Sequence, residues 1–265
     1  MSSNLIITLI QSDSFWEDKE KNLQMFEEKI KSISKKTELV ILPEMFSTGF
    51  SMKPKLFAEN MHDASVEWMK KIATTHKIIL TGSLIIEEEG NFYNRLIWML
   101  PNGQYGFYNK RHLFAFAGEN EQYTPGNKRM ITSVNGWKVN VQICYDLRFP
   151  VWSRQSILEG NHEYDVLLFV ANWPQSRSTA WKTLLQARAI ENQCYVVGLN
   201  RVGNDGNKIY YSGNSMIIDP LGEILYHKED EEDEFTTTLN KQHLEECRNK
   251  FPFWKNADNF VISHE

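Results

Sequence analysis

Apolar runs and amphipathic segments alternate at the start of the chain. The run LIITLI at residues 5–10 has the length of a strand, and a second apolar run, ELVILP, occupies 38–43. Between them, apolar residues recur at spacings of three and four, at Leu23, Phe26, Ile30 and Ile33. A period near 3.6 indicates a helix, whereas a short continuous apolar run indicates a buried strand, so this segment predicts a β-α-β unit.

The same alternation continues further along the chain. A helical pattern around 66–73 precedes the strand-like IILTGSLII, and YNRLIWML turns through Pro101-Asn102-Gly103 into QYGFYNK, which is typical of a hairpin. KVNVQIC, YDVLLFVAN, a helix from about 179 to 192 and CYVVGLN follow. Such near-continuous apolar strands are typical of sheets covered on both faces. Since no repeat, linker or break in composition interrupts the pattern, we expect one mixed α/β domain over 1–265.

Three segments stand apart from this alternation. We interpret the acidic run KEDEEDE at 228–234 as a solvated loop, and VGNDGN at 202–207 as a turn, because the latter lacks the Lys and Ser/Thr of a phosphate-binding loop. The C-terminal tail, about 249–265, carries four aromatic residues in FPFWKNADNF. We expect these rings to be covered by a partner surface or by the tail's own subunit.

Composition narrows the class of function. The 265 residues are 42% hydrophobic and 24% charged, with a formal net charge of −5. This acidic balance argues against binding to nucleic acid or to an anionic membrane surface, so small molecules are the expected partners. The N-terminus lacks the basic region of a signal peptide, and no apolar run reaches the length of a membrane span, which together favour a cytoplasmic protein.

Cysteine and histidine usage argues against disulfides and metals. Cys144, Cys194 and Cys247 are widely spaced, odd in number and without a CxxC pair, as expected in a reducing compartment. The seven histidines include no HxxxH or HxH pair. We therefore expect neither a metal nor another cofactor, and any functional cysteine must act without a second one.

Chemistry-bearing residues follow three of the apolar strands. Cys144 ends a strand in VQICYDLRFP, Glu44 follows VILP, and Lys110 ends FYNK, with Glu119 nine residues further on. A buried cysteine is often only a small core residue, and a carboxylate or lysine at a strand end is often a surface charge. Together, however, these residues offer a nucleophile, a base and a cation at the ends of different strands, where α/β sheets place their ligands.

These blocks resemble the nitrilase superfamily of carbon–nitrogen hydrolases. LPEMFSTGF, YNKRHLF followed by GE, and CYDLRFP match its Glu, Lys and Cys blocks in order, and ANWP with QARAIENQCYVVGLNRVG extends the resemblance over nearly the whole chain. The sequences of these blocks are most similar to those of bacterial omega-amidases. The resemblance implies a four-layer αββα sandwich, amide hydrolysis without a cofactor, and a homodimer.

It also implies a role for each residue. Glu44 is expected to be the general base for the Cys144 nucleophile, and Lys110 with the backbone N–H of Tyr145 to stabilise the oxyanion. Glu119 is expected to hold Lys110 and the substrate amide in position.

The substrate side of the site is read from nearby residues. Arg148 either binds a substrate carboxylate or forms an internal salt bridge, for instance with Asp146. Three aromatic residues are candidates for an apolar wall, although such residues are often plain core. They are Phe114, Phe116 and Trp173.

Alternative functions remain open at this point. His112 could pair with Cys144 as in papain-like hydrolases, or the fold could be a catalytically silent binding protein. For the substrate, the resemblance favours 2-oxoglutaramate and 2-oxosuccinamate over a larger acid amide such as deaminated glutathione.

Overall fold

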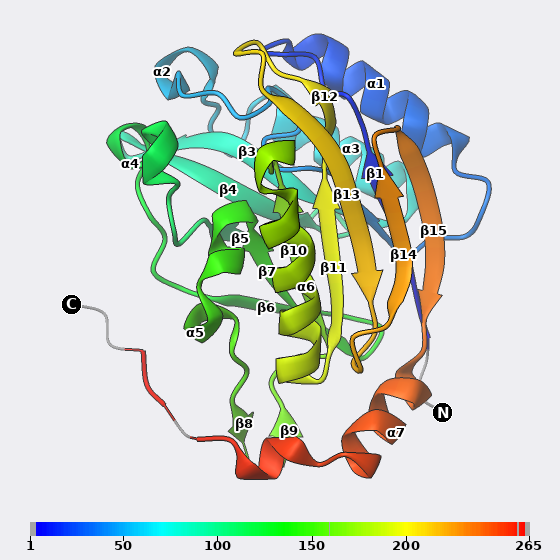
Figure 1. The fold of residues 1–265 in the computed structure, drawn as a ribbon. Helices are drawn as coiled ribbons and strands as arrows, with labels where there is room; N and C mark the ends of the chain where they lie inside the picture. Colours follow the sequence, from blue (N-terminus) through cyan, green and yellow to red (C-terminus); the bar gives the residue numbers. More distant parts are fainter. Residues whose placement is uncertain (1–3, 159, 259, 263–265) are drawn as a thin grey trace.

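Two β-sheets lie face to face, with helices on their outer sides (Figure 1). The computed structural model describes residues 4–158, 160–258 and 260–262. The strands of the first sheet lie in the order β15-β1-β2-β3-β4-β5. Their bounds are β1 Leu5–Gln11, β2 Leu39–Ile41, β3 Ile79–Glu88, β4 Asn91–Met99, β5 Tyr105–Asn109 and β15 Asp233–Leu239.

The second sheet is built from the C-terminal half of the chain. Its strands lie in the order β12-β13-β11-β10-β7-β6, and β14 also pairs with β13. Their bounds are β6 Met130–Val134, β7 Trp137–Ile143, β10 Val166–Ala171, β11 Tyr195–Asn200, β12 Val202–Asn204, β13 Tyr210–Ile218 and β14 Ile224–Glu229. A small separate ladder pairs β8 Ile157–Leu158 with β9 Asn161–His162.

Helices cover the outer face of each sheet. On the first sheet, α1 Lys19–Ser32 and α3 Ala64–His76 bury apolar stripes that include Phe26 and Met69 against strand residues such as Val40. On the second, α6 Ser178–Asn192 packs on β11 and β13. The shorter helices are α2 Pro54–Phe57, η1 Ala115–Ala117, α4 Glu119–Gln122, η2 Cys144–Arg148, α5 Pro150–Ser153, η3 Gln175–Arg177, α7 Lys241–Lys250 and η4 Phe253–Asn256.

The main core lies between the sheets. Ile7 and Leu9 of β1 share one buried cluster with Val141 of β7 and Leu168 of β10, and the cluster extends to Leu185 of α6. The continuous apolar strands of the sequence are thus strands with no solvent-exposed face. Helices, two sheets and helices therefore form four layers, which confirms the expected αββα sandwich.

Strand direction determines where polar residues gather. β1, β2 and β3 run parallel, as do β7, β10 and β11. The hairpins β3-β4 and β4-β5 are antiparallel, so β5 again runs in the direction of β2. The residues that follow β2 and β5 consequently lie at the same end of the strands of the first sheet.

The structure corrects the prediction for the acidic run in the C-terminal third. The acidic run at 228–234 is not a solvated loop, because it comprises the end of β14, a short connection and the start of β15. Glu234 of this run forms an ion pair with Lys29 of α1 at 3.3 Å. Charged residues are poor strand formers, and here the pairing of β15 with β1 outweighs that local preference.

The described part of the C-terminal tail lies against its own subunit. Phe251 and Trp254 are half-buried, the Trp254 ring lies 5.5 Å from that of His162, and Ile262 packs on the main core. Residue 259 and residues 263–265 of the tail lie outside the described residues. Phe253 nevertheless remains 66% exposed. In the described part of the chain no helix is both long and apolar enough to cross a membrane.

Candidate active site

The residues that end three strands meet between the two sheets. Glu44 follows β2, Lys110 follows β5, and Cys144 follows β7 and begins η2. The Glu44 and Lys110 side chains are both fully buried. The structure thus brings together the acid, the cation and the thiol that the sequence placed at separate strand ends.

A buried ion cluster is the centre of the site. Lys110 Nζ donates to Glu44 Oε1 at 2.9 Å and to Glu119 Oε1 and Oε2 at 3.0 and 2.9 Å. Glu119 is also fully buried, so it is not the exposed loop charge that would have been its simplest interpretation. Burying charged groups is costly unless each is paired and hydrogen-bonded, and here the three groups supply one another's partners.

Main-chain and amide donors satisfy the remaining carboxylate oxygens. The Asn172 N–H donates to Glu44 Oε2 at 2.7 Å, and the Phe114 N–H donates to Glu119 Oε2 at 2.6 Å. The Asn94 side-chain amide donates to Glu44 Oε1 at 2.8 Å and to Glu119 Oε1 at 3.2 Å, bridging the two acids. Each carboxylate is therefore held by donors from two or more segments.

The cluster shifts the acid-base behaviour of its members. Burial lowers the pKa of Lys110, but the charges of Glu119 and Glu44 outweigh it and hold this pKa above its usual range. Burial raises the pKa of Glu119, and Lys110 only partly offsets this. Burial and the nearby Glu44 carboxylate raise the pKa of the Cys144 thiol well above its usual range. This shift favours the neutral thiol over the thiolate.

The thiol is presented by a sharp turn. Cys144 has φ of 44°, a conformation that costs energy for any residue with a side chain, at the junction between β7 and η2. Its Sγ lies 3.9 Å from the main-chain oxygen of Asn172, at the end of β10. A strand followed by a tight turn into a helix projects the side chain out of the sheet, as in the nucleophile elbows of other hydrolases.

Asp146 fixes this turn through hydrogen bonds. It also binds His112, the histidine of the alternative papain-like mechanism. Its Oδ2 accepts from Tyr108 Oη at 2.7 Å and from the Ile143 N–H at 3.0 Å, while Oδ1 accepts from the His112 N–H and lies 2.8 Å from His112 Nδ1. The His112 ring also stacks on Phe149, with centroids 3.8 Å apart. His112 is thus bound to Asp146 and not to Cys144, which removes the support for a papain-like pair.

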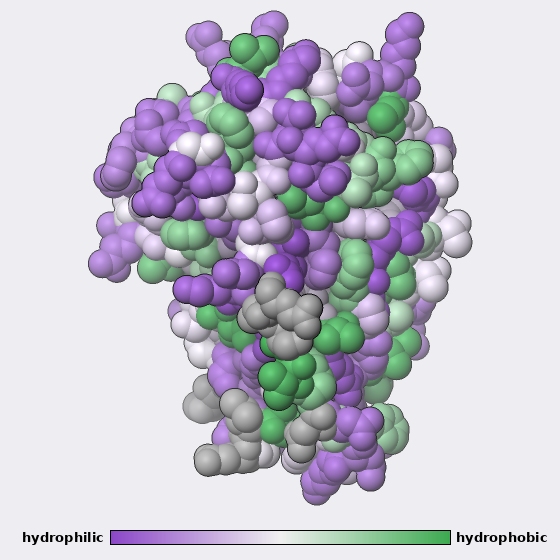
Figure 2. Space-filling model, turned by 90° about the vertical axis from the view of Figure 1, so that its left-hand side faces the viewer, coloured by the Kyte–Doolittle hydropathy of each residue, from purple (hydrophilic) through white to green (hydrophobic). Residues whose placement is uncertain are grey.

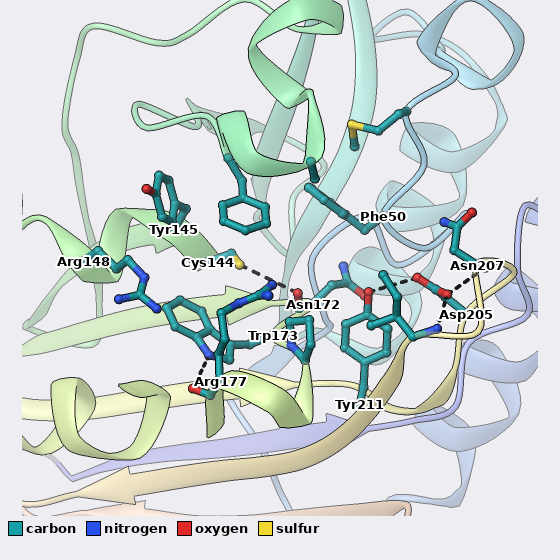
Figure 3. A pocket seen from close by; sticks show the side chains of 15 residues that line it. Phe50, Cys144, Tyr145, Arg148, Asn172, Trp173, Arg177, Asp205, Asn207 and Tyr211 are labelled. Atoms are coloured by element: carbon teal, nitrogen blue, oxygen red, sulfur yellow. Dashed lines mark hydrogen bonds between the residues drawn. The ribbon is translucent and has the colours of Figure 1, made fainter. Parts of the chain in front are cut away.

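A cavity of about 130 Å³ opens onto the thiol. Of the predicted substrate-binding residues, Phe114, Arg148 and Trp173 line it, together with Cys144 and Tyr145 (Figure 3). Arg148 does not pair with Asp146; its guanidinium carbon lies 5.1 Å from the Trp173 ring. The internal salt bridge considered for Arg148 is therefore absent from the described residues.

The prediction that Phe116 forms part of the apolar wall of the site is wrong. Phe116 lies in the 3-10 turn η1 and is 87% exposed, and it does not line the cavity. The main chain on both sides of Phe114 is tied to Glu119, through the Phe114 N–H and the Glu119 N–H to Phe114 O bond of 3.3 Å. The Phe116 ring lies beside that of Phe114, with centroids 5.8 Å apart, but only Phe114 lines the cavity.

Sequence reasoning missed several residues of the site. Asn172 stands in ANWP directly after an apolar strand, a signal that could have identified it, whereas Asn94 is hidden inside the strand run YNRLIWML. The segment 202–207, predicted as a turn, is a strand over Val202–Asn204 and a turn only after it, and Asp205 and Asn207 of that turn also line the cavity. Arg177, which follows ANWP, lines the same cavity. Among the residues that the structure describes, no group of three His, Cys, Asp or Glu side chains could hold a metal ion.

Comparison with known proteins identifies the family. The model of the carbon–nitrogen hydrolase family matches residues 6–249. The chain belongs to this family. The hydrolase is 42% identical over 259 residues to the omega-amidase YafV of Escherichia coli K12, covering 97% of this chain and 98% of that protein. It is 33% identical over 250 residues to the 2-oxoglutaramate amidase of Bacillus subtilis, covering 93% and 95%.

Solved structures agree with the fold of this carbon–nitrogen hydrolase. XC1258 from Xanthomonas campestris, a CN-hydrolase superfamily protein with an arsenic adduct in its active site, matches with a TM-score of 0.96 and 40% identity. That match covers 98% of this chain and all of the other. Nit3 of Saccharomyces cerevisiae, a member of the nitrilase superfamily, matches with a TM-score of 0.84 and 27% identity over 95% and 96% of the two chains.

The ion cluster generates a prediction about stability. Lys110→Met leaves Glu44 and Glu119 buried without their cation, which should cost about 3–5 kcal/mol near neutral pH. The pKa of Glu119 is already raised, and losing Lys110 raises it further. A carboxyl with a raised pKa in the folded state binds its proton more tightly when folded, so the variant should recover stability as the pH falls from 8 to 5.

Thermal unfolding of wild type and variant across this pH range checks the expectation. Lys53→Met is the control, because it removes the lysine of an exposed ion pair with Glu17 and should change little. A deficit of Lys110→Met that stays constant or grows toward pH 5 would contradict the cluster as described.

Proposed function

We propose that this hydrolase is an omega-amidase, which releases ammonia from the terminal amide of short 2-oxo dicarboxylic acid monoamides such as 2-oxoglutaramate and 2-oxosuccinamate. The observation that carries the proposal is the Cys144 thiol at a small cavity lined by Arg148 and Arg177, beside a buried Glu44–Lys110–Glu119 cluster. The names of the relatives, omega-amidase and 2-oxoglutaramate amidase, support the substrate class.

In the acylation half-reaction, Glu44 accepts the Cys144 proton as sulfur attacks the amide carbon. The carbonyl becomes an oxyanion, which Lys110 and the Tyr145 N–H stabilise, each donor contributing about 3 kcal/mol in comparable oxyanion holes. The Tyr145 N–H lies in the first turn of η2, where N–H groups have no intrahelical acceptor. The C–N bond then breaks, Glu44 returns its proton to the nitrogen, and ammonia leaves a thioester on Cys144.

In the deacylation half-reaction, Glu44 takes a proton from water, and the hydroxyl adds to the thioester carbon. The same donors stabilise the second oxyanion. Collapse breaks the C–S bond, and the proton returns from Glu44 to sulfur, which restores the neutral thiol and frees the acid. Lys110 remains a cation throughout, because its raised pKa excludes it as the base, and Glu119 holds it toward the reacting carbonyl.

The cavity favours a small substrate over a large one. Its volume of about 130 Å³ is below the roughly 300–1,000 Å³ of pockets for drug-sized ligands. A short acid amide fits this size better than deaminated glutathione. Arg148 provides a guanidinium that could bind the substrate carboxylate through two parallel hydrogen bonds.

The roles of Cys144 and Glu44 are tested by substitution. Cys144→Ala should abolish ammonia release while leaving the fold intact, and Glu44→Gln should lower the rate by several orders of magnitude, because the carboxylate acts in both half-reactions. Wild type with substrate and hydroxylamine should yield a hydroxamate from the thioester. Appreciable turnover by Cys144→Ala would refute the mechanism, and loss of wild-type activity on dialysis against EDTA with recovery on adding zinc would refute a metal-free reaction.

Substrate choice is tested by comparing kcat/KM for 2-oxoglutaramate and deaminated glutathione, with the first expected to be the larger. Arg148→Ala should cost roughly 2–5 kcal/mol for 2-oxoglutaramate, where it leaves a buried carboxylate without its partner, and much less for propionamide. Higher efficiency with deaminated glutathione would overturn the assignment. An equal loss on both amides would place the carboxylate elsewhere.

We further propose that the protein acts in the cytoplasm as a homodimer. The three cysteines, all free thiols in the structure, support a reducing compartment. The side of the molecule that carries α5 and the C-terminal tail exposes apolar side chains in its lower half (Figure 2). Val151 of α5, Ile190 of α6 and Phe253 of the tail are 57%, 52% and 66% exposed, and we call these three residues the α5–α6 face. Apolar surface of this kind favours a partner.

Light scattering tests the dimer. Wild type should have the mass of a dimer at micromolar concentration, and Phe253→Asp, or a chain ending at residue 249, should shift it toward the monomer. Leu56→Asp is a matched control, since Leu56 of α2 is 74% exposed but lies outside the α5–α6 face. A wild-type monomer, or an equal effect of Leu56→Asp, would contradict this interface.

A further inference from the structure

Arg177 is held in place at the cavity by its main chain. It ends η3, directly before α6. Its N–H donates to Pro174 O at 3.0 Å, and its carbonyl accepts from Trp173 Nε1 at 2.8 Å. In Figure 3 its side chain extends from this anchored turn into the cavity toward Cys144 and Asn172.

The guanidinium of Arg177 has no acid to neutralise it within the described residues. Its carbon lies 5.0 Å from the Phe114 ring, which holds the side chain without cancelling its charge. Other arginines of the chain differ in this respect, because Arg201 pairs with Asp13 and Arg248 with Asp165, at 2.8 and 2.9 Å. Arg177 thus keeps its hydrogen-bond donors available beside a largely apolar cavity.

Asp205, the acid that lines the cavity, already accepts hydrogen bonds from neighbouring groups. Asp205 Oδ1 accepts from the N–H groups of Asn207 and Ile209 at 2.8 and 2.9 Å, and Oδ2 accepts from Tyr211 Oη at 3.1 Å. Figure 3 places Asp205 across the cavity from the two arginines. One end of the cavity is therefore cationic and uncompensated.

Trp173 connects the two arginines at that end. The Arg148 guanidinium lies 5.1 Å from the centre of the Trp173 ring, and Trp173 Nε1 donates a hydrogen bond to the Arg177 carbonyl. We propose that Arg177 joins Arg148 in a two-arginine anchor for the substrate carboxylate, and that their two positive charges select acid amides that carry no ammonium group beside that carboxylate. This inference rests on the proposed omega-amidase function and adds to it a second residue that recognises the carboxylate of the substrate.

The proposed anchor predicts which of several related amides the enzyme prefers. A neutral amide of the same length leaves both guanidinium groups without a partner. L-Glutamine presents the same carboxylate and terminal amide, but its 2-ammonium group is repelled by two nearby cations. A 2-oxo acid has no such charge, so the two arginines favour 2-oxo over 2-amino monoamides.

The test compares kcat/KM for four amides in wild type, Arg177→Ala and Arg177→Lys. The amides are 2-oxoglutaramate, glutaramate, L-glutamine and pentanamide. Arg177→Ala should lower kcat/KM for the two anionic amides by about 30-fold or more, mainly through KM, and should narrow the preference for glutaramate over glutamine. Pentanamide turnover should change by less than about 3-fold, which also verifies an intact thiol site. Arg177→Lys should recover part of the loss, because it keeps the charge without the planar fork.

Lys182→Ala is the matched control, since it removes one positive charge from α6 at a residue that does not line the cavity. A second readout is the affinity of glutarate for Cys144→Ala protein with and without Arg177→Ala, measured by calorimetry. Equal losses on glutaramate and pentanamide, or equal glutarate affinity, would overturn the role of Arg177. If wild type hydrolyses neither 2-oxoglutaramate nor glutaramate, the proposed function fails instead, and the glutarate measurement still decides the role of Arg177.

Discussion

The site depends on one buried cation. Lys110 carries its charge in a fully buried position, which is tolerable only because Glu44 and Glu119 approach it at 2.9 Å from two other segments. The carboxylates in turn require the Asn94, Asn172 and Phe114 donors. Since these groups come from both sheets, the cluster can form only when the two sheets are packed together.

The same burial determines the resting state of the thiol. Burial and the neighbouring Glu44 carboxylate raise the pKa of Cys144, which is why the proposed mechanism needs a base to take the thiol proton. The turn that presents Cys144 is held separately by Asp146, which binds Tyr108, His112 and the Ile143 N–H. The position of the thiol and its pKa are thus influenced by different buried acids, Asp146 and Glu44.

The proposed reaction uses two parts of the cavity wall. In this proposal the reacting amide binds at the ion cluster, where donors are fixed before the oxyanion forms. The substrate carboxylate is proposed to bind at Arg148 and Arg177, which Trp173 contacts through its ring and its Nε1 respectively.

Sequence pattern alone determined the elements that carry the site. The continuous apolar strands predicted buried sheets, and Glu44, Lys110 and Cys144 were candidates because each stands at the end of an apolar run in a block that resembles the nitrilase superfamily. The pattern failed for β15, where charged residues become a strand because β1 offers an edge to pair with. It also failed for Phe116, whose direction depends on how the η1 turn is tied to Glu119.

Tertiary structure decided which of those residues meet. Sequence order separates Asn94 and Asn172 from Glu44 by 50 and 128 positions, so the sequence does not show that these residues meet. Whether Arg148 pairs with Asp146 or faces the cavity likewise depended on the packing of His112 and Tyr108 around that acid. Local periodicity fixes where a strand ends, whereas the pairing of Lys110 with Glu44 and Glu119, and the Asn172 hydrogen bond from the second sheet, are long-range contacts that exist only after the chain has folded.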